Sequence, residues 1–447
     1  MRANVSLRRT LTTLPLVFVL FFCVSGGAYS TETLVATVGP GIALGLLIVV
    51  PIIWSLPEVL IVGELASMLP EEGGYYAWVR RAFGQFWAFQ NGWWTWMYSL
   101  VDMAIYPVLF NQYLAFFFPD LSTTVRWGTS LVMIWSTAAV NLRGVQKVGS
   151  VSVVAGVGIL TAFLLLAIGA TPHVTHLPWL PLVPPGKDIT GSLGVGLSIA
   201  LWNYVGWDNA STVQGEVVDA SRSYPAALAR ALPLVLLAYM VPMLPALGAT
   251  DWRTWHEGGW PDIARAAVGG TAGKGIAVLL ALGGMVSAVA LFNALLMAYS
   301  RIPFAMANDG LLPAALGRTD RRDVPRVAIV TSAIVYSVFA LVPFADLVVA
   351  DVMLYSLALF LEFAALVHFR RHEPELRGAF RVPTGTTGVV LLAALPMVVL
   401  AAIIVLGARD GEYAGPALLG SLAAVLAGPI VYVVATARRR RATVESS

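Results

Sequence analysis

The sequence predicts an all-α protein that crosses a membrane many times, and three observations predict this fold class. Apolar residues make up 58% of the 447 residues, charged residues only 12%, and the mean hydropathy is +0.78. Apolar runs recur along the whole chain, each long enough for the roughly 20 residues that a helix needs to cross a bilayer. Short polar segments separate these runs. A soluble fold does not need so much apolar surface.

Taken in order, the apolar runs predict about twelve transmembrane helices. The predicted spans cover residues 12–37, 40–68, 85–117, 124–142, 148–170, 189–217, 226–248, 274–304, 325–343, 346–369, 387–407 and 414–437. No loop between them is long enough for a soluble catalytic module. We therefore expect residues 1–447 to form a single integral membrane domain.

Two of these spans are interrupted in their middle. Ser25-Gly26-Gly27 breaks the first span, and residues 203–206 break the sixth, which begins the second half of the chain. Unwinding a helix inside lipid leaves backbone N–H and C=O groups without partners, which is tolerated where they line a cavity or meet a ligand. Paired breaks in corresponding positions of two halves indicate the binding site of a transporter.

The first span has an alternative interpretation as a secretory signal peptide. Arg8 and Arg9 precede an apolar run at residues 14–24, and small residues follow at 25–28, which is the pattern of a cleaved leader. The matching break near residue 204 argues against it, because cleavage would remove one half of a pair.

The distribution of basic residues predicts the orientation. With a cytoplasmic N-terminus, few of the 28 lysines and arginines fall in outer segments. These few are Arg126, Lys187, Arg253, Arg265, Lys274 and Arg409. The positive-inside rule then places both termini and the 307–326 loop in the cytoplasm, with the 250–273 stretch outside as a surface helix or lid. The run at 438–441 follows a span, so we interpret it as a lipid anchor and expect no nucleic-acid binding.

The sequence lacks the signatures of several enzyme classes. We find no P-loop, no zinc-type cluster of His or Cys, and no Gly-x-Ser-x-Gly elbow. The five histidines fall in loops or at a span end, and the single cysteine, Cys23, cannot form an intramolecular disulfide. We therefore expect no enzymatic activity, no cofactor, no metal site and no ATP-driven transport by this chain alone.

The charges inside the spans are all negative. Away from span ends the sequence has six acids and no Lys or Arg at comparable depth. They are Glu32, Glu58, Asp102, Asp208, Asp351 and Glu362. An unpaired carboxylate in a membrane interior either holds a proton or meets a cation that arrives from outside. Asp351 is near an outer end, where we expect solvent, and Glu362 is near an inner end, where we expect a contact with a neighbouring helix.

Glu32 and Asp208 each lie a few residues beyond a break. A carboxylate there can cap the resumed half-helix and complement its dipole, or it can bind substrate. Asp208 follows Trp202, Tyr204 and Trp207, and aromatic faces beside a carboxylate suit an ammonium group.

Asp102 and Glu58 lie in uninterrupted spans. Asp102 has Tyr98 at i−4 and Tyr106 at i+4 on the same helix face, which fits a structural acid or a substrate contact. Glu58 follows Pro57. It is either the proton site or a partner for backbone groups that the proline frees.

Several motifs extend this interpretation. They are Val24-Ser25-Gly26-Gly27, Trp54-Ser55-Leu56-Pro57-Glu58, Gly63-Glu64-Leu65-Ala66, Pro70-Glu71-Glu72-Gly73-Gly74-Tyr75, Phe89-Gln90-Asn91-Gly92-Trp93, Asp102-Met103-Ala104-Ile105-Tyr106-Pro107-Val108-Leu109, Trp202-Asn203-Tyr204, Trp207-Asp208, Gly215-Glu216-Val217, Tyr299-Ser300-Arg301, Phe304-Ala305-Met306-Ala307 and Leu361-Glu362-Phe363-Ala364-Ala365. From about residue 12 to 385, the chain resembles the amino acid–polyamine–organocation permeases. It most resembles their polyamine:proton symporter branch, known from plants.

That resemblance implies a leucine-transporter-type fold. Ten core helices at residues 12–370 would form two inverted five-helix repeats with discontinuous first and sixth helices, and two peripheral helices would follow at 387–437. In the amino acid carriers of the family, the amides at 25–27 would receive a substrate carboxylate. A polyamine has no carboxylate, so acids would recognise it instead.

The predicted site combines the two breaks with the buried acids. The predicted substrate-binding residues are Ser25, Gly26, Gly27, Tyr29, Glu32, Asp102, Trp202, Asn203, Tyr204, Trp207 and Asp208, and Glu58 is the predicted proton-coupling residue. Some family members couple to protons through a lysine deep in the fifth span. This chain has only Lys147 at that span's inner edge, which leaves proton, sodium or no coupling ion open.

We predict a secondary active transporter of the cell membrane for a small organic cation, namely a polyamine such as putrescine or spermidine, by proton symport. Its expected partners are the substrate, protons and the lipid bilayer, and no obligate protein partner is evident. The alternative is an amino acid permease or exchanger. A substrate sensor or partner-dependent subunit with the same fold is a third interpretation.

Overall fold

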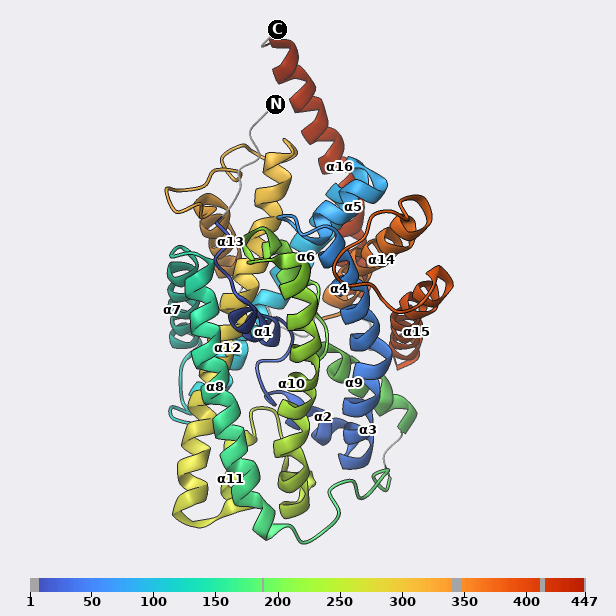
Figure 1. Cartoon of the computed structure of the whole chain (residues 1–447). Coiled ribbons are helices and arrows are strands. Elements are labelled where there is room, and N and C mark those ends of the chain that lie inside the picture. The colour runs from blue at the N-terminus through green and yellow to red at the C-terminus, as the bar shows by residue number, and fades with distance from the viewer. Residues whose placement is uncertain (1–7, 187–188, 340–347, 411–414, 446–447) are drawn as a thin grey trace.

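A computed structural model describes residues 8–186, 189–339, 348–410 and 415–445, and these residues are overwhelmingly helical (Figure 1). The first part of the chain forms α1 (Thr13–Val24), α2 (Thr31–Val38), α3 (Pro40–Val50), the π-helical η1 (Pro51–Ser55), α4 (Leu56–Met68), α5 (Tyr75–Phe83), α6 (Gln85–Leu114), α7 (Thr123–Asn141) and α8 (Val145–Ala170).

The remainder continues as helices. It comprises η2 (Thr171–His173), α9 (Ile189–Trp202), η3 (Asn209–Glu216), α10 (Ala220–Ala249), η4 (Trp252–Thr254), α11 (Trp260–Val268), α12 (Gly270–Asn308), α13 (Arg326–Phe339), α14 (Val348–His372), α15 (Thr386–Asp410) and α16 (Gly415–Glu445).

Four stretches of the described residues are long and apolar enough to cross a membrane. They are Pro40–Met68, Val145–His173, Ala220–Ala249 and Gly270–Asn308. Shorter apolar helices accompany them at Thr13–Val24, Leu193–Trp202, Arg326–Val338, Thr386–Ala402 and Leu422–Ala437. The architecture is that of a multi-pass helical membrane protein.

Both breaks separate two helical segments in the structure. The first lies between α1 and α2, where Gly26 and Gly27 have φ of 66° and 107°. The second lies between α9 and η3, and Gly206 there has φ of 100°. A side chain at such positive φ is strained, so glycine permits these turns.

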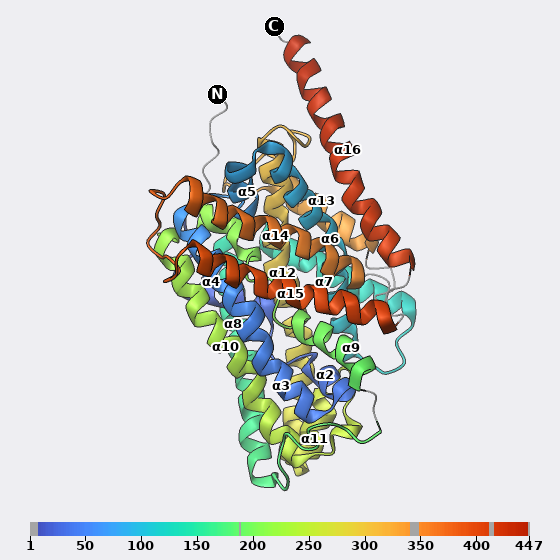
Figure 2. The same ribbon diagram turned by 90° about the vertical axis from the view of Figure 1, so that its right-hand side faces the viewer.

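The long helix α12 packs against α1, α6, α7 and α8 in the interior of the bundle (Figure 1). Helices α14 and α15 lie side by side (Figure 2), and α14 packs on α6. Helix α1 packs on the longer helices α8, α10 and α12, whereas α2 packs on α9 and α3. Residues 25–29 of the first break are buried, so the unwound backbone is shielded from lipid.

The loop before α5 touches the backbone of η3. The Gly73 amide donates to the Thr212 carbonyl at 3.0 Å. A Cβ atom on Gly74 would lie 2.2 Å from Ser211 Oγ and 2.3 Å from its carbonyl carbon. The paired glycines thus permit a close approach that positions η3, the segment after the second break.

The end of the bundle that carries α11 is covered by residues 250–268. η4 and α11 form this segment, and α11 packs on α8 and α12 (Figure 1). Trp260 Nε1 donates to the Ala28 carbonyl at 2.8 Å, so the cover contacts the chain next to the first break. The stretch predicted as a surface helix or lid contains these two short helices.

Two buried ion pairs connect helices at the other end. Arg370 donates through Nε to Glu64 Oε1 at 2.8 Å, and also contacts the carbonyls of Val382 and Thr384. Arg301 donates through Nη2 to Glu216 Oε1 at 2.8 Å. These pairs connect α4 with α14 and η3 with α12.

Candidate functional site

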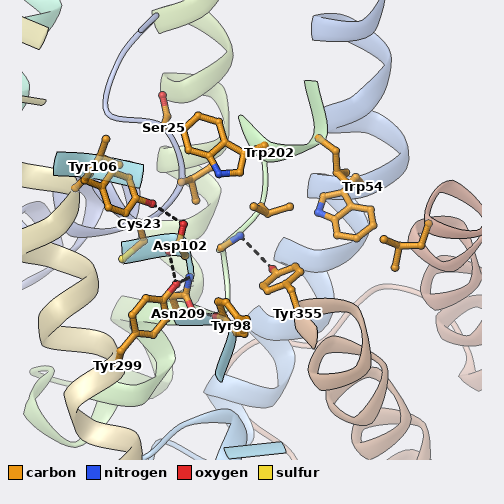
Figure 3. Close-up of a pocket in the computed structure, with 16 residues that line it drawn as sticks. Cys23, Ser25, Trp54, Tyr98, Asp102, Tyr106, Trp202, Asn209, Tyr299 and Tyr355 are labelled. Carbon is orange, nitrogen blue, oxygen red and sulfur yellow. Dashed lines mark hydrogen bonds between the residues drawn. The ribbon is translucent and has the colours of Figure 1, made fainter. Parts of the chain in front are cut away.

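A cavity lies beside the two helix breaks, and its walls come from both breaks and from α1, η1, α6, α9, η3, α12, α14 and α15 (Figure 3). Six of its sixteen lining residues are aromatic. They are Trp54, Tyr98, Tyr106, Trp202, Tyr299 and Tyr355. Of the predicted substrate-binding residues, Ser25, Asp102 and Trp202 line this cavity.

Among the described residues that line the cavity, Asp102 is the one acid. Tyr106 donates its hydroxyl to Oδ1 at 2.9 Å, and Tyr299 donates to Oδ2 at 2.8 Å (Figure 3). These two donors are neutral, and no basic side chain in the described part of the chain contacts the carboxylate. Each carboxylate oxygen can accept further hydrogen bonds, so Asp102 can receive a cationic group from the cavity.

The aromatic walls favour the same ligand chemistry. Tyr98 packs edge to face against Tyr299 and Tyr355, with ring centroids 5.5 and 5.4 Å apart. Aromatic faces attract ammonium groups and also contact methylene chains. One carboxylate inside an aromatic cavity therefore suits a slim organic cation.

Two further predicted acids lie behind Tyr355, outside the cavity lining. The Tyr355 hydroxyl is 2.8 Å from Glu58 Oε1 and 3.2 Å from Asp208 Oδ1, and it accepts from the Gly206 amide at 3.1 Å. The Trp207 amide also donates to Glu58 Oε1, at 3.1 Å. A phenol has one hydrogen to donate, so the two acids compete for it.

The backbone amides of the first break already have partners. The amides of Ser25 and Gly26 donate to the Phe21 carbonyl at 2.8 and 3.1 Å, and the Gly27 amide donates to Ser25 Oγ at 3.2 Å. The Gly26 carbonyl accepts from Ser287 Oγ at 2.6 Å. The amides of Ser25, Gly26 and Gly27 are therefore not free to receive a ligand carboxylate in this conformation.

Tyr29 and Glu32 do not line the cavity, and Glu32 lies against the covering segment at residues 250–268. Tyr29 donates to the Leu280 carbonyl at 2.9 Å. Glu32 Oε1 accepts from the Tyr113 hydroxyl at 2.9 Å and from the Gly258 amide at 3.1 Å. Glu32 thus ties α2 to α6 and to the covering segment.

The remaining predicted residues of the second break mostly make structural contacts. Ser30 donates to Asn203 Oδ1 at 2.8 Å, which connects the two breaks directly. Tyr204 donates to the Leu47 carbonyl at 2.7 Å, and the Trp207 side chain is fully buried. Asn203, Tyr204 and Trp207 therefore position the backbone around the cavity without lining it.

Sequence reasoning missed several residues of the site. Tyr299 and Tyr355 were not among the predicted contacts, and neither was Asn209, which accepts from the Tyr98 hydroxyl at 2.8 Å. The spacing within α14 could have pointed to Tyr355, because it lies two helical turns before the buried acid Glu362 and on the same helix face. The side chain of Asp351 lies outside the described residues.

Comparisons with known proteins agree with a transport site. The family model for amino acid permeases matches residues 13–416. The chain is 35% identical over 398 residues to the polyamine transporter RMV1 of Arabidopsis thaliana, covering 88% of this chain and 80% of the relative. It is 33% identical over 401 residues to the polyamine transporter PUT1 of Oryza sativa subsp. japonica, covering 89% and 74%. An uncharacterized transporter of Legionella pneumophila is 25% identical over 393 residues.

Proposed function

This chain belongs to the amino acid permease family, and we propose that it carries polyamines across the cell membrane by symport with protons. The support from comparison is the similarity to plant proteins named polyamine transporters over most of both chains. The support from chemistry is the site itself, which offers a carboxylate and aromatic faces to a cation.

One observation favours an organic cation over an amino acid. An amino acid carries a carboxylate that needs hydrogen-bond donors, and the first break would be its receptor. The amides of Ser25, Gly26 and Gly27 already donate within the protein. The Asp102 carboxylate accepts from two neutral hydroxyls, and no base among the described residues contacts it.

In this proposal one ammonium group of the substrate binds Asp102, and the methylene chain lies along the aromatic walls. The five single bonds of putrescine span roughly 6 Å between its nitrogens. The second ammonium group would then approach Tyr355, behind which Asp208 and Glu58 supply negative charge. Glu32 is less suited to the same diamine, because its partner Tyr113 lies about 16 Å along α6 from Asp102.

The fold that we propose is the two-repeat arrangement of this family. The two breaks would occupy corresponding positions in two inverted five-helix repeats within residues 12–370. The helices at 387–437 would be peripheral, which makes twelve transmembrane helices in all. The role is that of a carrier, not of an enzyme.

Transport by the purified protein tests this proposal. Liposomes with an imposed pH gradient should accumulate labelled putrescine, and the accumulation should collapse when a protonophore removes the gradient. Labelled leucine and arginine, tested in parallel, measure the amino acid alternative. Accumulation of leucine without putrescine would replace the polyamine proposal with an amino acid permease. Binding of putrescine without movement of any substrate would favour a sensor.

The orientation needs a separate test. We propose that both termini and the loop after α12 face the cytoplasm, in accord with the positive-inside rule. A Cys23→Ser background allows single cysteines at the exposed positions Ala315 and Arg253. An impermeant thiol reagent added to intact cells should label position 253 and not position 315. The reverse pattern would invert the orientation.

A further inference from the structure

Three buried carboxyl groups cluster beside the cavity, and two of them contact the Tyr355 hydroxyl. Glu58 comes from α4, Asp208 from the second break and Glu362 from α14, and all three are at most 2% exposed. The Glu362 side chain lies beside the side chains of Asp208 and Asn91. Among the described residues, no Lys, Arg or His contacts this group. Three full negative charges without a base would be very costly at this depth.

The cluster has more buried acceptor oxygens than hydrogen-bond donors to satisfy them. Glu58 Oε2 and both oxygens of Glu362 are buried and receive no hydrogen bond from the described protein atoms. Asn91 Oδ1 is also buried without a donor, while its Nδ2 donates to the Ala358 carbonyl at 3.1 Å. Carboxylate and amide oxygens only accept hydrogen bonds. A proton on Glu362 would supply the missing donor to Asp208 or to Asn91.

The other titratable groups that face the cluster cannot neutralise it. They come from five helices and comprise Cys23 on α1, Tyr75 on α5, Tyr98 and Asp102 on α6, Tyr224 on α10 and Tyr355 on α14. Thiols and phenols are ordinarily neutral at pH 7, and Asp102 adds a further negative charge. The compensating charge must therefore come from solvent.

We propose that Glu58, Asp208 and Glu362 form a proton-binding site, in which Asp208 and Glu362 share the proton that accompanies the substrate. The proposal rests on proton symport and assigns its site, adding Glu362 to the predicted residue Glu58. Two neighbouring buried carboxyl groups hold one proton readily, because ionising both would place two like charges side by side in a low-dielectric interior. A proton also needs no cavity of its own, unlike a second ammonium group.

Tyr355 connects this site to the substrate cavity. Tyr355 lines the cavity, and Figure 3 shows its hydroxyl beside a backbone amide of the lining, that of Gly206. The same hydroxyl contacts Glu58 and Asp208, which are not among the lining residues. An ammonium group that donates to the hydroxyl oxygen directs the single hydrogen toward the acids. Substrate in the cavity and proton in the cluster thus affect the same hydroxyl, which gives a physical route for coupling.

The decisive variant is Glu362→Gln, which keeps the shape of the side chain and permanently removes the exchangeable proton. Glu375→Gln is the matched control, because Glu375 is exposed beyond the end of α14. We expect Glu362→Gln to lose accumulation of putrescine driven by a pH gradient, while exchange of putrescine between preloaded and external pools continues without a gradient. Glu375→Gln should do both as the wild type does.

Infrared spectroscopy provides a readout that does not depend on transport. The wild-type protein should show the carbonyl band of a buried protonated carboxyl group, which disappears as the pH is raised. That band should be absent from Glu362→Gln and present in Glu375→Gln. The wild-type measurement stands even if Glu362→Gln does not yield folded protein.

The outcomes separate the two proposals. If the wild type does not transport putrescine, the proposed function fails. If the wild type accumulates putrescine and Glu362→Gln does so equally under a pH gradient, the proton site is wrong while the function stands. A wild-type protein without the protonated carboxyl band at neutral pH would also overturn the proton site.

Discussion

Glu58 and Glu64 lie less than two turns apart on α4, both fully buried, and their surroundings differ in one decisive way. Glu64 forms an ion pair with Arg370 and accepts from the Val382 amide at 2.7 Å. Glu58 accepts from the Tyr355 hydroxyl and the Trp207 amide, which are neutral donors. Burial of an acid therefore does not reveal its role, whereas the presence or absence of a base does.

The same contrast separates two regions of the molecule. Near the ends of α4 and α12, buried acids meet arginines, whose forked donors bind two oxygens or several carbonyls at once. Around Tyr355 and the cavity, the described acids have hydroxyls, amides and one another as neighbours, and no base contacts them. The first region holds helices together, and the second keeps negative charge available for a ligand.

The largest expected effect compares the two glutamates of α4. Glu64→Gln leaves the Arg370 charge buried without its counter-ion and should lower the free energy of unfolding by about 3–5 kcal/mol. Glu58→Gln retains an amide oxygen for its two donors and should change it by less than about 1 kcal/mol. Thermal unfolding of the purified proteins in detergent measures both. Equal losses in the two variants would remove the distinction between paired and unpaired acids.

The next effect concerns substrate affinity. Asp102→Asn should remove a charge-assisted contact of about 1.5–3 kcal/mol, and weaken putrescine binding by about one to two orders of magnitude. Asp208→Asn should weaken it less, because Asp208 acts from behind Tyr355. Asp262→Asn, an exposed site on α11, serves as the control. Calorimetric titration with putrescine would contradict this order if Asp208→Asn had the larger effect.

The first break can be tested through its glycines. A Cβ on Gly26 would lie 2.5 Å from Ser287 Oγ, and one on Gly27 would lie 2.8 Å from an Ile159 methyl group. With the positive φ angles, each Gly→Leu substitution should strain the backbone by about 1–3 kcal/mol. We expect both variants to insert and fold but not to bind putrescine. Binding at wild-type affinity would make the break purely structural.

The smallest effect compares a buried serine with an exposed one. Ser287→Ala removes the hydrogen bond to the Gly26 carbonyl, and should destabilise the protein by about 1 kcal/mol. Ser150→Ala on the exposed side of α8 should have no measurable effect. Unfolding temperatures of the two variants test this. An unchanged unfolding temperature for Ser287→Ala would show that the Gly26 carbonyl accepts a hydrogen bond from another donor in the variant.

Local sequence patterns predicted the features that one helix determines by itself. Glycine and serine in an apolar run located the interruption between α1 and α2. The i, i+4 spacing placed Tyr106 and Asp102 on one face, and their hydrogen bond is 2.9 Å long. The relatives and the family model bear out the predicted permease family.

Contacts between helices that are far apart in the chain could not be predicted from sequence spacing. Tyr299 and Tyr355 reach the cavity from α12 and α14, nearly 200 or more residues along the chain from Asp102, and no local pattern encodes that approach. The position of Asp208 behind Tyr355 depends on how η3 resumes after the break. Glu64 and Arg370 likewise meet only because α4 and α14 are neighbours.

The short pairing near the N-terminus has a practical consequence for spectroscopy. The amides of Thr10 and Leu11 donate to the Glu216 carbonyl, the Val218 amide donates back to Leu11, and Arg8 contacts Asp323. The start of the described chain is therefore fastened to the segment that follows the second break. Spin labels at Arg9 and at the exposed Arg321 would measure the distance between these two positions. Because residues 10 and 11 are hydrogen-bonded to Glu216 at the end of η3, a change in that distance would report a movement of η3.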